Sequence, residues 1–333
     1  MRLLLNDRLV NDRASAFWVV EPGRGEIRTA ALAPPGPAML RVRMLASGIS
    51  RGTETLVFRG QVPASQHQAM RCPLQEGDFP GPVKYGYSAV GLVEAGPADW
   101  PGRRVFCLHP HQDRFNLAIE AALPVPAGVP TRRAVLAANL ETALNGLWDA
   151  GALPGDRIAI VGAGVVGGLV AVLAARLPGT RVTLVDRDPA RAELARALGC
   201  GFALPDAAPG EQDLVIHASG APEGLALALG LAGFEATVLD MSWYGDRPVA
   251  LPLGEAFHAR RLTIRSSQVG AVAPAQRPRW SHRRRLTLAL DLLADPVYDR
   301  FLDGDSAFAD LPDTMARLAA DPAGALCRLV LYP

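Results

Sequence analysis

The segment Gly162-Ala163-Gly164-Val165-Val166-Gly167 constrains this chain more than any other, because its glycines have the spacing G-x-G-x-x-G. Gly162 permits a tight turn, and Gly164 lets the backbone approach a pyrophosphate closely. Gly167 lets the following helix pack against the preceding strand. The segment predicts a glycine turn that binds a dinucleotide.

The surroundings of the motif support this interpretation. A strand-like apolar run at 157–161 precedes it, and a helical pattern at 166–177 follows. Val165 and Val166 open that helix, where unpaired N–H groups and the helix dipole favour a phosphate. Asp186 stands nineteen residues beyond the last glycine and ends the next strand.

Strand and helix patterns alternate from residue 157 onward, which is typical of a doubly wound parallel sheet in an α/β protein. Asp188 as N-cap, Pro189 and Gly199 bound one of the predicted helices, at 189–198. The predicted strands are 157–161, 181–185, 213–217, 236–239 and 262–266. Helices at 282–294 and 313–320 and a strand at 327–331 are expected to close the chain.

Asp186 can accept hydrogen bonds from adenosine ribose hydroxyls and would repel a 2′-phosphate, so the sequence favours NAD over NADP. Arg187 follows directly and could attract such a phosphate, which keeps NADP as the alternative. Two further segments, His217-Ala218-Ser219-Gly220 and Asp240-Met241-Ser242, end predicted strands where such a sheet meets its ligand. Ser219 is therefore included among the cofactor contacts.

The first part of the chain has a different character, with strand patterns at 39–44, 88–94 and 104–108 separated by turn residues. A proline-rich stretch at 124–130 interrupts regular structure before the Ala/Leu-rich segments begin. We expect an all-β, barrel-like first domain and a domain junction near that stretch.

The chain has 34 Lys and Arg against 33 Asp and Glu, a net charge of +1, which argues against a protein whose main task is nucleic-acid binding. No run reaches the ~18 apolar residues that cross a bilayer. The four cysteines have no regular spacing and favour a reducing cytoplasm. Lys84 is the one lysine; every other basic side chain, histidine aside, is arginine.

Three local stretches resemble the medium-chain dehydrogenase/reductase superfamily of zinc-type alcohol dehydrogenases: 48–54 (Gly-Ile-Ser-Arg-Gly-Thr-Glu), 85–91 (Tyr-Gly-Tyr-Ser-Ala-Val-Gly) and 153–156 (Leu-Pro-Gly-Asp). The resemblance implies a GroES-like β-barrel catalytic domain at 1–137, a Rossmann domain at 138–278, and a C-terminal return at 279–333. It also implies an active-site cleft between the domains and a homodimer joined at the last sheet strand.

The sequence departs from that family where its zinc-dependent members hold the metal. Those places carry Ser50 (or Arg51), Tyr87 with Ser88, and Ala138, none a good zinc ligand. The four-cysteine structural-zinc lobe is also missing. We therefore expect no bound metal, and the 48–54 loop resembles that of bacteriochlorophyllide dehydrogenases, whose substrate is not carried over.

An alternative metal site remains open at this stage. Cys107, His109 and His111 would project to one side if their segment stayed extended. Pro110 interrupts that segment, which argues against the site.

Without zinc, hydrogen-bond donors must stabilise the charge on the substrate oxygen. Ser50, Thr53 and Tyr87 offer hydroxyls at or beside the vacated metal positions. Lys84 could place an ammonium near Tyr87 or lower the pKa of its phenol, if the chain turns between them. These four residues are the predicted catalytic set.

Neighbouring residues receive secondary interpretations. Glu54 could relay protons, although a hydrogen bond to the loop backbone is favoured, and His111 could carry a proton. Thr142 matches the family's Thr-Ala pair and is predicted to approach the nicotinamide. The arginine-rich run at 277–285 is interpreted as a solvated helix start or salt-bridge face rather than a nucleic-acid or phosphate site.

The predicted function is an NAD-dependent, zinc-independent oxidoreductase that interconverts a secondary alcohol and a ketone, a small-molecule substrate, without nucleic-acid or membrane partners. One alternative is an NAD(P)H-dependent reductase of enones or quinones. Another is a dinucleotide-binding sensor or structural protein without turnover.

Overall fold

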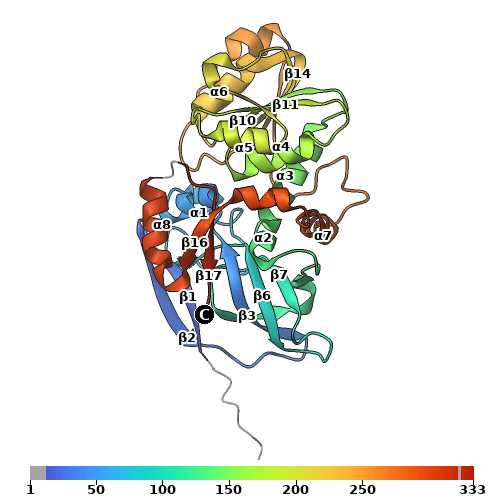
Figure 1. The fold of residues 1–333 in the computed structure, drawn as a ribbon. Coiled ribbons are helices and arrows are strands. Elements are labelled where there is room, and N and C mark those ends of the chain that lie inside the picture. The colour runs from blue at the N-terminus through green and yellow to red at the C-terminus, as the bar shows by residue number, and fades with distance from the viewer. Residues whose placement is uncertain (1–12, 322–323) are drawn as a thin grey trace, which may run out of the picture.

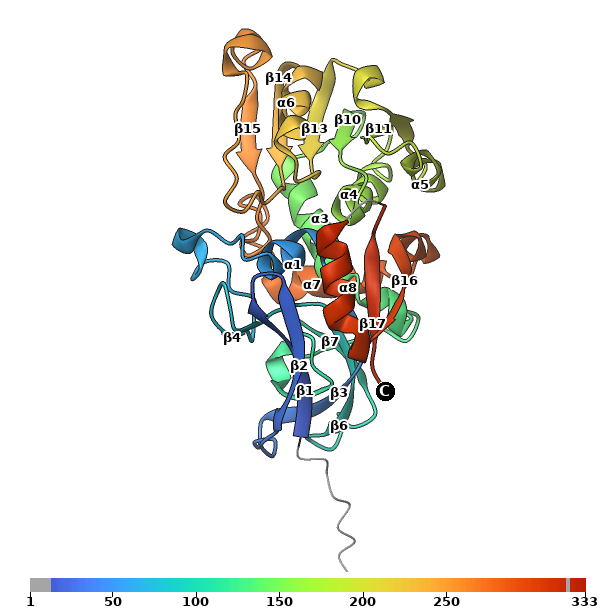
Figure 2. The same ribbon diagram turned by 90° about the vertical axis from the view of Figure 1, so that its left-hand side faces the viewer.

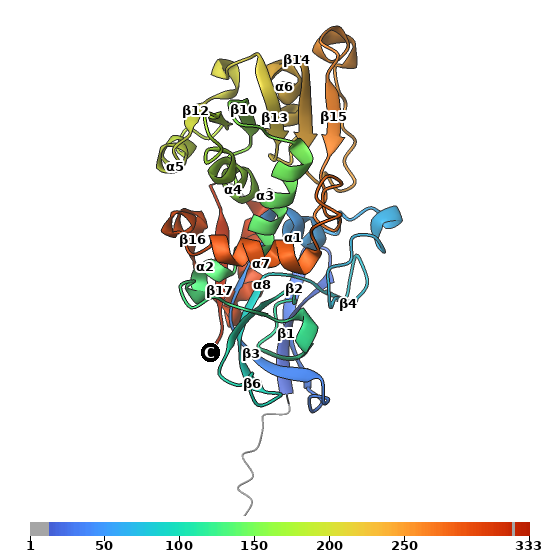
Figure 3. The ribbon, with the colours of Figure 1, turned by 90° about the vertical axis from the view of Figure 1, so that its right-hand side faces the viewer.

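The computed structural model describes residues 13–321 and 324–333. A domain built on a parallel sheet stands above a domain built on two mixed or antiparallel sheets, and α3 (Ala137–Ala150) runs between them (Figures 1 and 3). The order of elements along the chain places β1 to α2 (residues 13–134), and the described residues from β16 (302) onward, in the lower domain.

The upper sheet has six parallel strands in the order β12-β11-β10-β13-β14-β15. Chain order reverses direction between β10 and β13, which is the switch point where such sheets bind ligands. The predicted parallel sheet is therefore confirmed. Its strands are β10 (Arg157–Val161), β11 (Arg181–Val185), β12 (Gly201–Ala203), β13 (Gln212–His217), β14 (Ala232–Asp240) and β15 (Thr263–Ser266).

Helices cover both faces of this sheet because side chains alternate along each buried strand. Ile158 and Ile160 pack with the helices α3 and α4 (Val165–Ala174), whereas Ala159 and Val161 pack with α6 (Pro222–Leu231). The helix α5 (Arg191–Ala197) lies on the α4 side. The carboxyl ends of the strands are left open toward the lower domain (Figure 2).

The lower domain contains a four-stranded sheet, β2-β1-β5-β4, and a seven-stranded sheet in which β16-β17-β3-β6-β7-β9 are neighbours and β8 pairs β3. Its first strands are β1 (Arg13–Glu21), β2 (Arg24–Ala31), β3 (Met39–Gly48), β4 (Glu76–Gly77), β5 (Val83–Lys84), β6 (Ala89–Ala95), β7 (Arg104–Cys107), β8 (Arg114–Ala118) and β9 (Leu123–Pro124). The helices α1 (Arg51–Phe58) and α2 (Thr131–Ala134) belong to the same part of the chain.

The end of the chain returns to this lower domain. The helix α7 (His282–Leu292) crosses between the domains, and β16 (Leu302–Ala307), α8 (Leu311–Ala320) and β17 (Cys327–Leu331) follow. Because β17 pairs antiparallel with β3, the last strand completes a sheet begun near the start of the chain (Figure 2). Single turns of other helical types are η1 (Ala64–Gln66), η2 (Ile119–Ala121), η3 (Pro205–Ala207), η4 (Leu253–Phe257), η5 (Pro296–Phe301) and η6 (Phe308–Asp310).

Two predicted helix starts are wrong by two residues, those of α5 and of α8, which begins at Leu311 rather than at 313. The helix α5 begins at Arg191 rather than at 189, because the Asp188 side chain accepts the Ala190 N–H at 3.0 Å and closes a turn before the helix. The sequence patterns also gave no prediction for α1 or for the hairpin of β1 and β2. Of these elements, α1 contributes a residue, Arg51, to the pocket described next.

Candidate active site

A pocket of about 590 Å³ opens at the switch point of the parallel sheet. Strand ends, the first turn of α6 and a residue of α1 line it. The lining residues are Arg51, Val161, Gly162, Gly164, Val185, Asp186, Arg187, Asp188, Arg191, Pro205, Ala218, Ser219, Ala221, Glu223, Gly224, Leu227, Asp321 and Gly324. Five of the predicted cofactor contacts are among them, namely Gly162, Gly164, Asp186, Arg187 and Ser219.

The glycines of the motif have distinct roles in the geometry. Gly162 has φ +107°, and a Cβ there would lie 2.7 Å from the backbone of Ser219. A Cβ on Gly167 would lie 1.9 Å from the carbonyl oxygen of Gly162, so only glycine lets α4 approach β10. A Cβ on Gly164 would meet only Arg51 Nη2, at 3.9 Å. The side of Gly164 that faces the pocket is therefore open except for Arg51.

The start of α4 suits an anion. Gly164 is its N-cap, and no side chain caps the helix, so the first-turn N–H groups of Val165 and Val166 are not satisfied by a capping side chain. Arg51 reaches this point from α1, and burial lowers its pKa while Asp186 opposes that shift. The sequence reasoning named Arg51 only as an occupant of a vacated metal position. The structure adds it to the residues that line this pocket.

Asp186 is placed where the sequence predicted, at the end of β11. Its Oδ2 accepts the Ala163 N–H at 2.8 Å and its Oδ1 accepts the Asp188 N–H at 2.9 Å. The carboxylate thus fixes the glycine turn while facing the pocket. Arg187 is exposed at the same rim.

Three of the four predicted catalytic residues come together in the lower domain. The Ser50 and Thr53 side chains lie beside the Tyr87 hydroxyl and favour its ionised form, but burial outweighs them and raises the pKa of this phenol far above its ordinary value, with Glu54 adding to the shift. Asn139 Nδ2 donates to Ser50 Oγ at 3.4 Å, linking the cluster to α3. The phenol therefore stays protonated at neutral pH and can donate a hydrogen bond.

A buried chain of polar groups continues behind this hydroxyl cluster. Glu54 Oε1 accepts the Ser50 N–H at 2.7 Å, and Glu54 Oε2 lies 2.8 Å from His111 Nε2. His111 Nδ1 lies 2.7 Å from Ser47 Oγ, which in turn lies 2.9 Å from the Tyr332 hydroxyl. The predicted backbone contact of Glu54 is present, and the His111 contact is an addition to it.

Lys84 is not part of the hydroxyl cluster. Its ammonium donates to Glu76 and, at 2.6 Å, to Gln112 Oε1, and it lies 6.0 Å from the Trp18 ring. Gly86, with φ +133°, supplies the turn that the sequence required, yet it directs Lys84 and Tyr87 to different partners. The suggestion that Lys84 lowers the Tyr87 pKa is wrong, because the carboxylate of Glu76 holds the ammonium elsewhere.

Thr142 lies on α3, where its hydroxyl donates to the Ala138 carbonyl at 2.9 Å. Like Val165 and Val166, it is outside the set of pocket-lining residues. Its predicted approach to the nicotinamide is untested.

The residues suggested for an alternative metal site are separated. His109 stacks on Phe115 at 3.7 Å between ring centroids, while His111 faces Glu54. Within 13–321 and 324–333, no group of three or more His, Cys, Asp and Glu side chains could hold a metal ion. The family's zinc positions carry hydroxyls and the Ala138 methyl, so the donor set present does not fit zinc.

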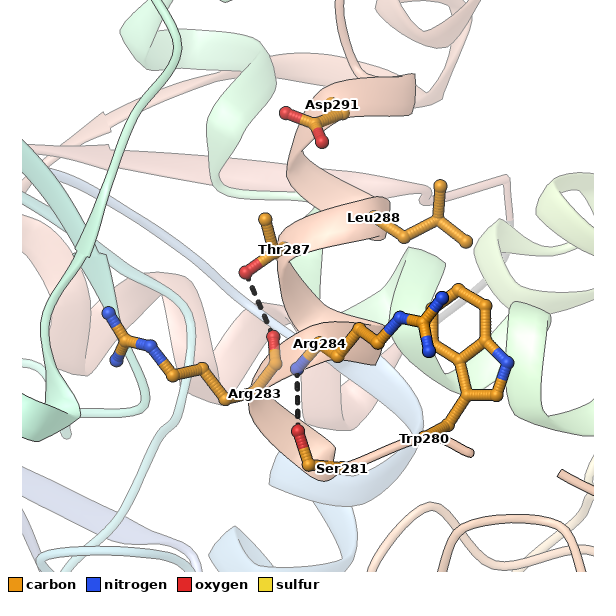
Figure 4. Close-up of a pocket in the computed structure, with 7 residues that line it drawn as sticks. All are labelled: Trp280, Ser281, Arg283, Arg284, Thr287, Leu288 and Asp291. Atoms are coloured by element: carbon orange, nitrogen blue, oxygen red, sulfur yellow. Dashed lines mark hydrogen bonds between the residues drawn. The ribbon is translucent and has the colours of Figure 1, made fainter. Parts of the chain in front are cut away.

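The arginine-rich run at 277–285 fixes α7 to its surroundings. Arg283 donates to the carbonyls of Glu120 and Ala122, and Arg285 is buried against Glu141 at 2.9 Å. Figure 4 shows Arg284 lying across Trp280, 3.9 Å from its ring centroid, beside a shallow hollow on the helix. Of these contacts, the one between Arg285 and Glu141 is a salt bridge, and the others are to backbone carbonyls and a ring.

Known proteins resemble this chain in sequence and in structure. No family model matches the chain. A D-guloside 3-dehydrogenase of Escherichia coli K12 is 25% identical over 210 residues, which are 60% of this chain and 58% of that protein. The chain thus matches less than two thirds of the length of this curated relative.

Solved structures match nearly the whole chain. A galactitol-1-phosphate dehydrogenase of Escherichia coli has a TM-score of 0.77 at 14% identity, covering 95% of this chain and 99% of that one. A protein of Escherichia coli CFT073 called a short chain alcohol dehydrogenase, in complex with NADH, has a TM-score of 0.76 at 17% identity, covering 96% and 100%.

The 2R,3R-butanediol dehydrogenase of Bacillus subtilis also has a TM-score of 0.76, at 15% identity, covering 96% and 99%. At these identities the likeness shows the fold. The chain therefore has the fold of the medium-chain alcohol dehydrogenase-like enzymes, and both the α/β class and the pairing of a GroES-like barrel with a Rossmann domain are confirmed. No helix in the described part of the chain has the length and apolar character to span a membrane.

Proposed function

We propose that this protein is an NAD-dependent, zinc-independent oxidoreductase that interconverts a secondary alcohol and a ketone. The observation that carries the proposal is the position of α1. Its N-cap Ser50 and first-turn Thr53 contact Tyr87, and its first residue, Arg51, lines the dinucleotide pocket. One helix thus joins the hydroxyl cluster to the place for a pyrophosphate.

The cofactor, when bound, supplies or accepts the hydride. Gly164 and the start of α4 hold its pyrophosphate together with Arg51. Asp186 accepts from the adenosine ribose, which supports NAD over NADP.

Tyr87 acts on the substrate oxygen. Because its pKa is raised, the phenol keeps its proton and donates to the oxygen of a ketone as negative charge develops there. Ser50 and Thr53 orient the hydroxyl. When the substrate oxygen takes the Tyr87 proton during reduction, Glu54 and His111, which are hydrogen-bonded to each other behind the cluster, would replace that proton, and during oxidation the proton would move the opposite way.

The names of the similar proteins support the choice of substrates to test. They describe dehydrogenases of a guloside, a sugar-alcohol phosphate and butanediol. We therefore propose a secondary hydroxyl on a small polyhydroxylated molecule as the substrate class.

We also propose a homodimer joined along β15. This four-residue strand ends the parallel sheet, so its outer edge has no neighbour within the described residues (Figure 2). Sedimentation velocity on the chain and on an Ile264→Pro variant tests the assignment, because proline at this edge removes a ladder donor. The four cysteines are all free, which supports a reducing cytoplasm as the location.

The direct test of the activity compares Tyr87→Phe with Tyr85→Phe. Tyr85 is a buried neighbour whose ring centroid lies 6.1 Å from that of Tyr87. With NAD and a panel of polyols, NADH formation at 340 nm is expected to fall at least about 100-fold in Tyr87→Phe and to change little in Tyr85→Phe. Equal rates in the wild type and Tyr87→Phe would overturn the role of Tyr87, and turnover of enones without any alcohol would favour a reductase of C=C bonds.

A further inference from the structure

A serine, a histidine and an aspartate form a linear hydrogen-bonded set at the edge of the dinucleotide pocket. Ser219 Oγ lies 2.6 Å from His217 Nε2, and His217 Nδ1 lies 2.9 Å from Asp240 Oδ1. His217 is completely buried and ends β13, while Asp240 ends the adjacent β14. Ser219 is exposed to the pocket.

The partners of Asp240 determine where the histidine carries its proton. Asp240 Oδ2 accepts from the Tyr244 hydroxyl at 2.9 Å, and Oδ1 accepts the Ser242 N–H at 3.0 Å. An acceptor-only carboxylate beside His217 Nδ1 requires that this nitrogen bear a hydrogen. In the neutral imidazole Nε2 is then an acceptor, and the Ser219 hydroxyl must donate to it.

Because the Ser219 hydroxyl hydrogen is used in this donation, Oγ can only accept hydrogen bonds from other groups. One lone pair accepts the Ala221 N–H at 3.2 Å, and the other is free for a ligand in the pocket. Gly224 allows the arrangement, because a Cβ there would lie 2.4 Å from Ser219 Oγ and 2.7 Å from His217 Nε2. Ser219 is therefore presented to the pocket as a hydrogen-bond acceptor.

The same geometry resembles that of a nucleophilic serine, but the nearby backbone N–H groups already donate hydrogen bonds within the protein. Gly220 donates its N–H to Ser242 Oγ at 3.0 Å, and Ala221 donates to Ser219 itself. Neither N–H group remains to stabilise an oxyanion. The arrangement favours ligand positioning over acyl transfer.

We propose that Ser219, fixed by His217 and Asp240, accepts a hydrogen bond from a ribose hydroxyl of the adenosine half of the cofactor. The inference rests on the proposed dinucleotide binding. The adenosine half is indicated because Ser219 shares its pocket with Asp186 and Arg187, whereas Ser50, Thr53 and Tyr87 are not among the lining residues. Ser219 and His217 are thus positioning residues, and Asp186 is not the only acceptor for the ribose.

The test measures how strongly adenosine nucleotides compete with NADH for binding, with NADH fluorescence as the signal. AMP, 2′-deoxy-AMP and 3′-deoxy-AMP are compared on the wild-type full-length chain, Ser219→Ala, His217→Asn and the exposed control Ser65→Ala. One deoxynucleotide is expected to bind the wild type and Ser65→Ala about 5- to 10-fold more weakly than AMP. In Ser219→Ala that nucleotide and AMP are expected to bind equally.

The same discrimination between nucleotides on Ser219→Ala as on the wild type would overturn the role of Ser219. In His217→Asn, the shorter amide can still donate to Asp240 but places no acceptor at the position of His217 Nε2, so the discrimination is expected to shrink. Full discrimination in a folded His217→Asn protein would overturn the role of His217. A wild-type chain that binds no NADH would overturn the proposed function as well, which separates the two failures.

Discussion

The Nε2 atom of His111 lies 2.8 Å from the Oε2 atom of Glu54, and the two side chains are 1% and 4% exposed. The two residues are 57 positions apart in the sequence, so the pairing depends on the fold rather than on local pattern. Gly86 makes room for it, because a Cβ there would lie 2.9 Å from the His111 ring. The pair supports the loop that carries Ser50 and Thr53.

The first prediction concerns this pair. His111→Gln keeps a hydrogen-bonding amide near Glu54 but cannot exchange a proton at neutral pH, so kcat is expected to fall about 10- to 100-fold. The Kd for NADH is expected to stay unchanged, because the pair lies outside the dinucleotide pocket. Steady-state kinetics and NADH titration measure the two quantities. An unchanged kcat across pH 6–9 would limit Glu54 and His111 to a structural role.

The second prediction concerns acid stability. Burial lowers the pKa of His109 to about 3. The unfolded chain therefore gains a proton below pH 6.5 that the folded chain does not bind, and the free energy of unfolding falls as pH decreases from 6.5 toward 3. His109 contributes about 1.4 kcal/mol per pH unit to the slope of the free energy of unfolding against pH.

His109→Gln is expected to reduce that slope between pH 6 and pH 4, measured by urea unfolding. His258→Gln serves as the control because His258 is exposed. The same slope in His109→Gln and the wild type would show that His109 does not govern the acid response.

The third prediction concerns Arg51. Arg51→Met is expected to weaken NADH binding about 10-fold, which corresponds to about 1.4 kcal/mol, because its guanidinium faces the open side of Gly164. Calorimetric titration at two salt concentrations is expected to show less salt dependence in the variant. Arg59→Met, just beyond the other end of α1, provides the control. Wild-type affinity in Arg51→Met would place the pyrophosphate elsewhere.

The fourth prediction concerns the buried Arg285, which bonds Glu141 and also donates to the Val269 carbonyl at 2.5 Å. Arg285→Met leaves Glu141 without its cationic partner in a site where burial already raises the pKa of Glu141. The free energy of unfolding is therefore expected to fall by about 3–5 kcal/mol. The double variant Arg285→Met/Glu141→Leu is expected to lose less free energy of unfolding than Arg285→Met alone. Chemical denaturation compares them, and a larger loss in the double variant would show that the ion pair is not what the single variant disrupts.

Local pattern predicted much of the parallel sheet, since β10 and β11 have the bounds expected from sequence, and it also predicted the bounds of β17 in the lower domain. Gly162, Gly164 and Asp186 were predicted because their roles depend on short-range spacing. The contacts of Lys84 could not be predicted in this way, because they depend on long-range packing. Its partners Glu76 and Gln112 come from other segments, and no spacing along the chain indicates them.

Two parts of the site depend on packing that the sequence does not show. The Ser219–His217–Asp240 set joins the ends of two strands, with His217 and Asp240 23 residues apart; the sequence placed these residues at strand ends and predicted Ser219 as a cofactor contact, but it did not indicate the hydrogen bonds among them. Ser47 and Tyr332 meet because β17 returns to β3, which is a feature of topology. The domain boundaries at 137/138 and 278/279, and the role of Thr142, remain predictions.

The most direct measurement for the central claim is alcohol oxidation by a chain freed of metal. The protein is dialysed against EDTA, its zinc content is checked by elemental analysis, and NADH formation is followed with the best polyol of the panel. The proposed hydroxyl chemistry predicts an unchanged rate in the metal-free wild type and at least about a 100-fold lower rate in Tyr87→Phe. A rate that disappears on dialysis and returns with added Zn²⁺ would contradict it.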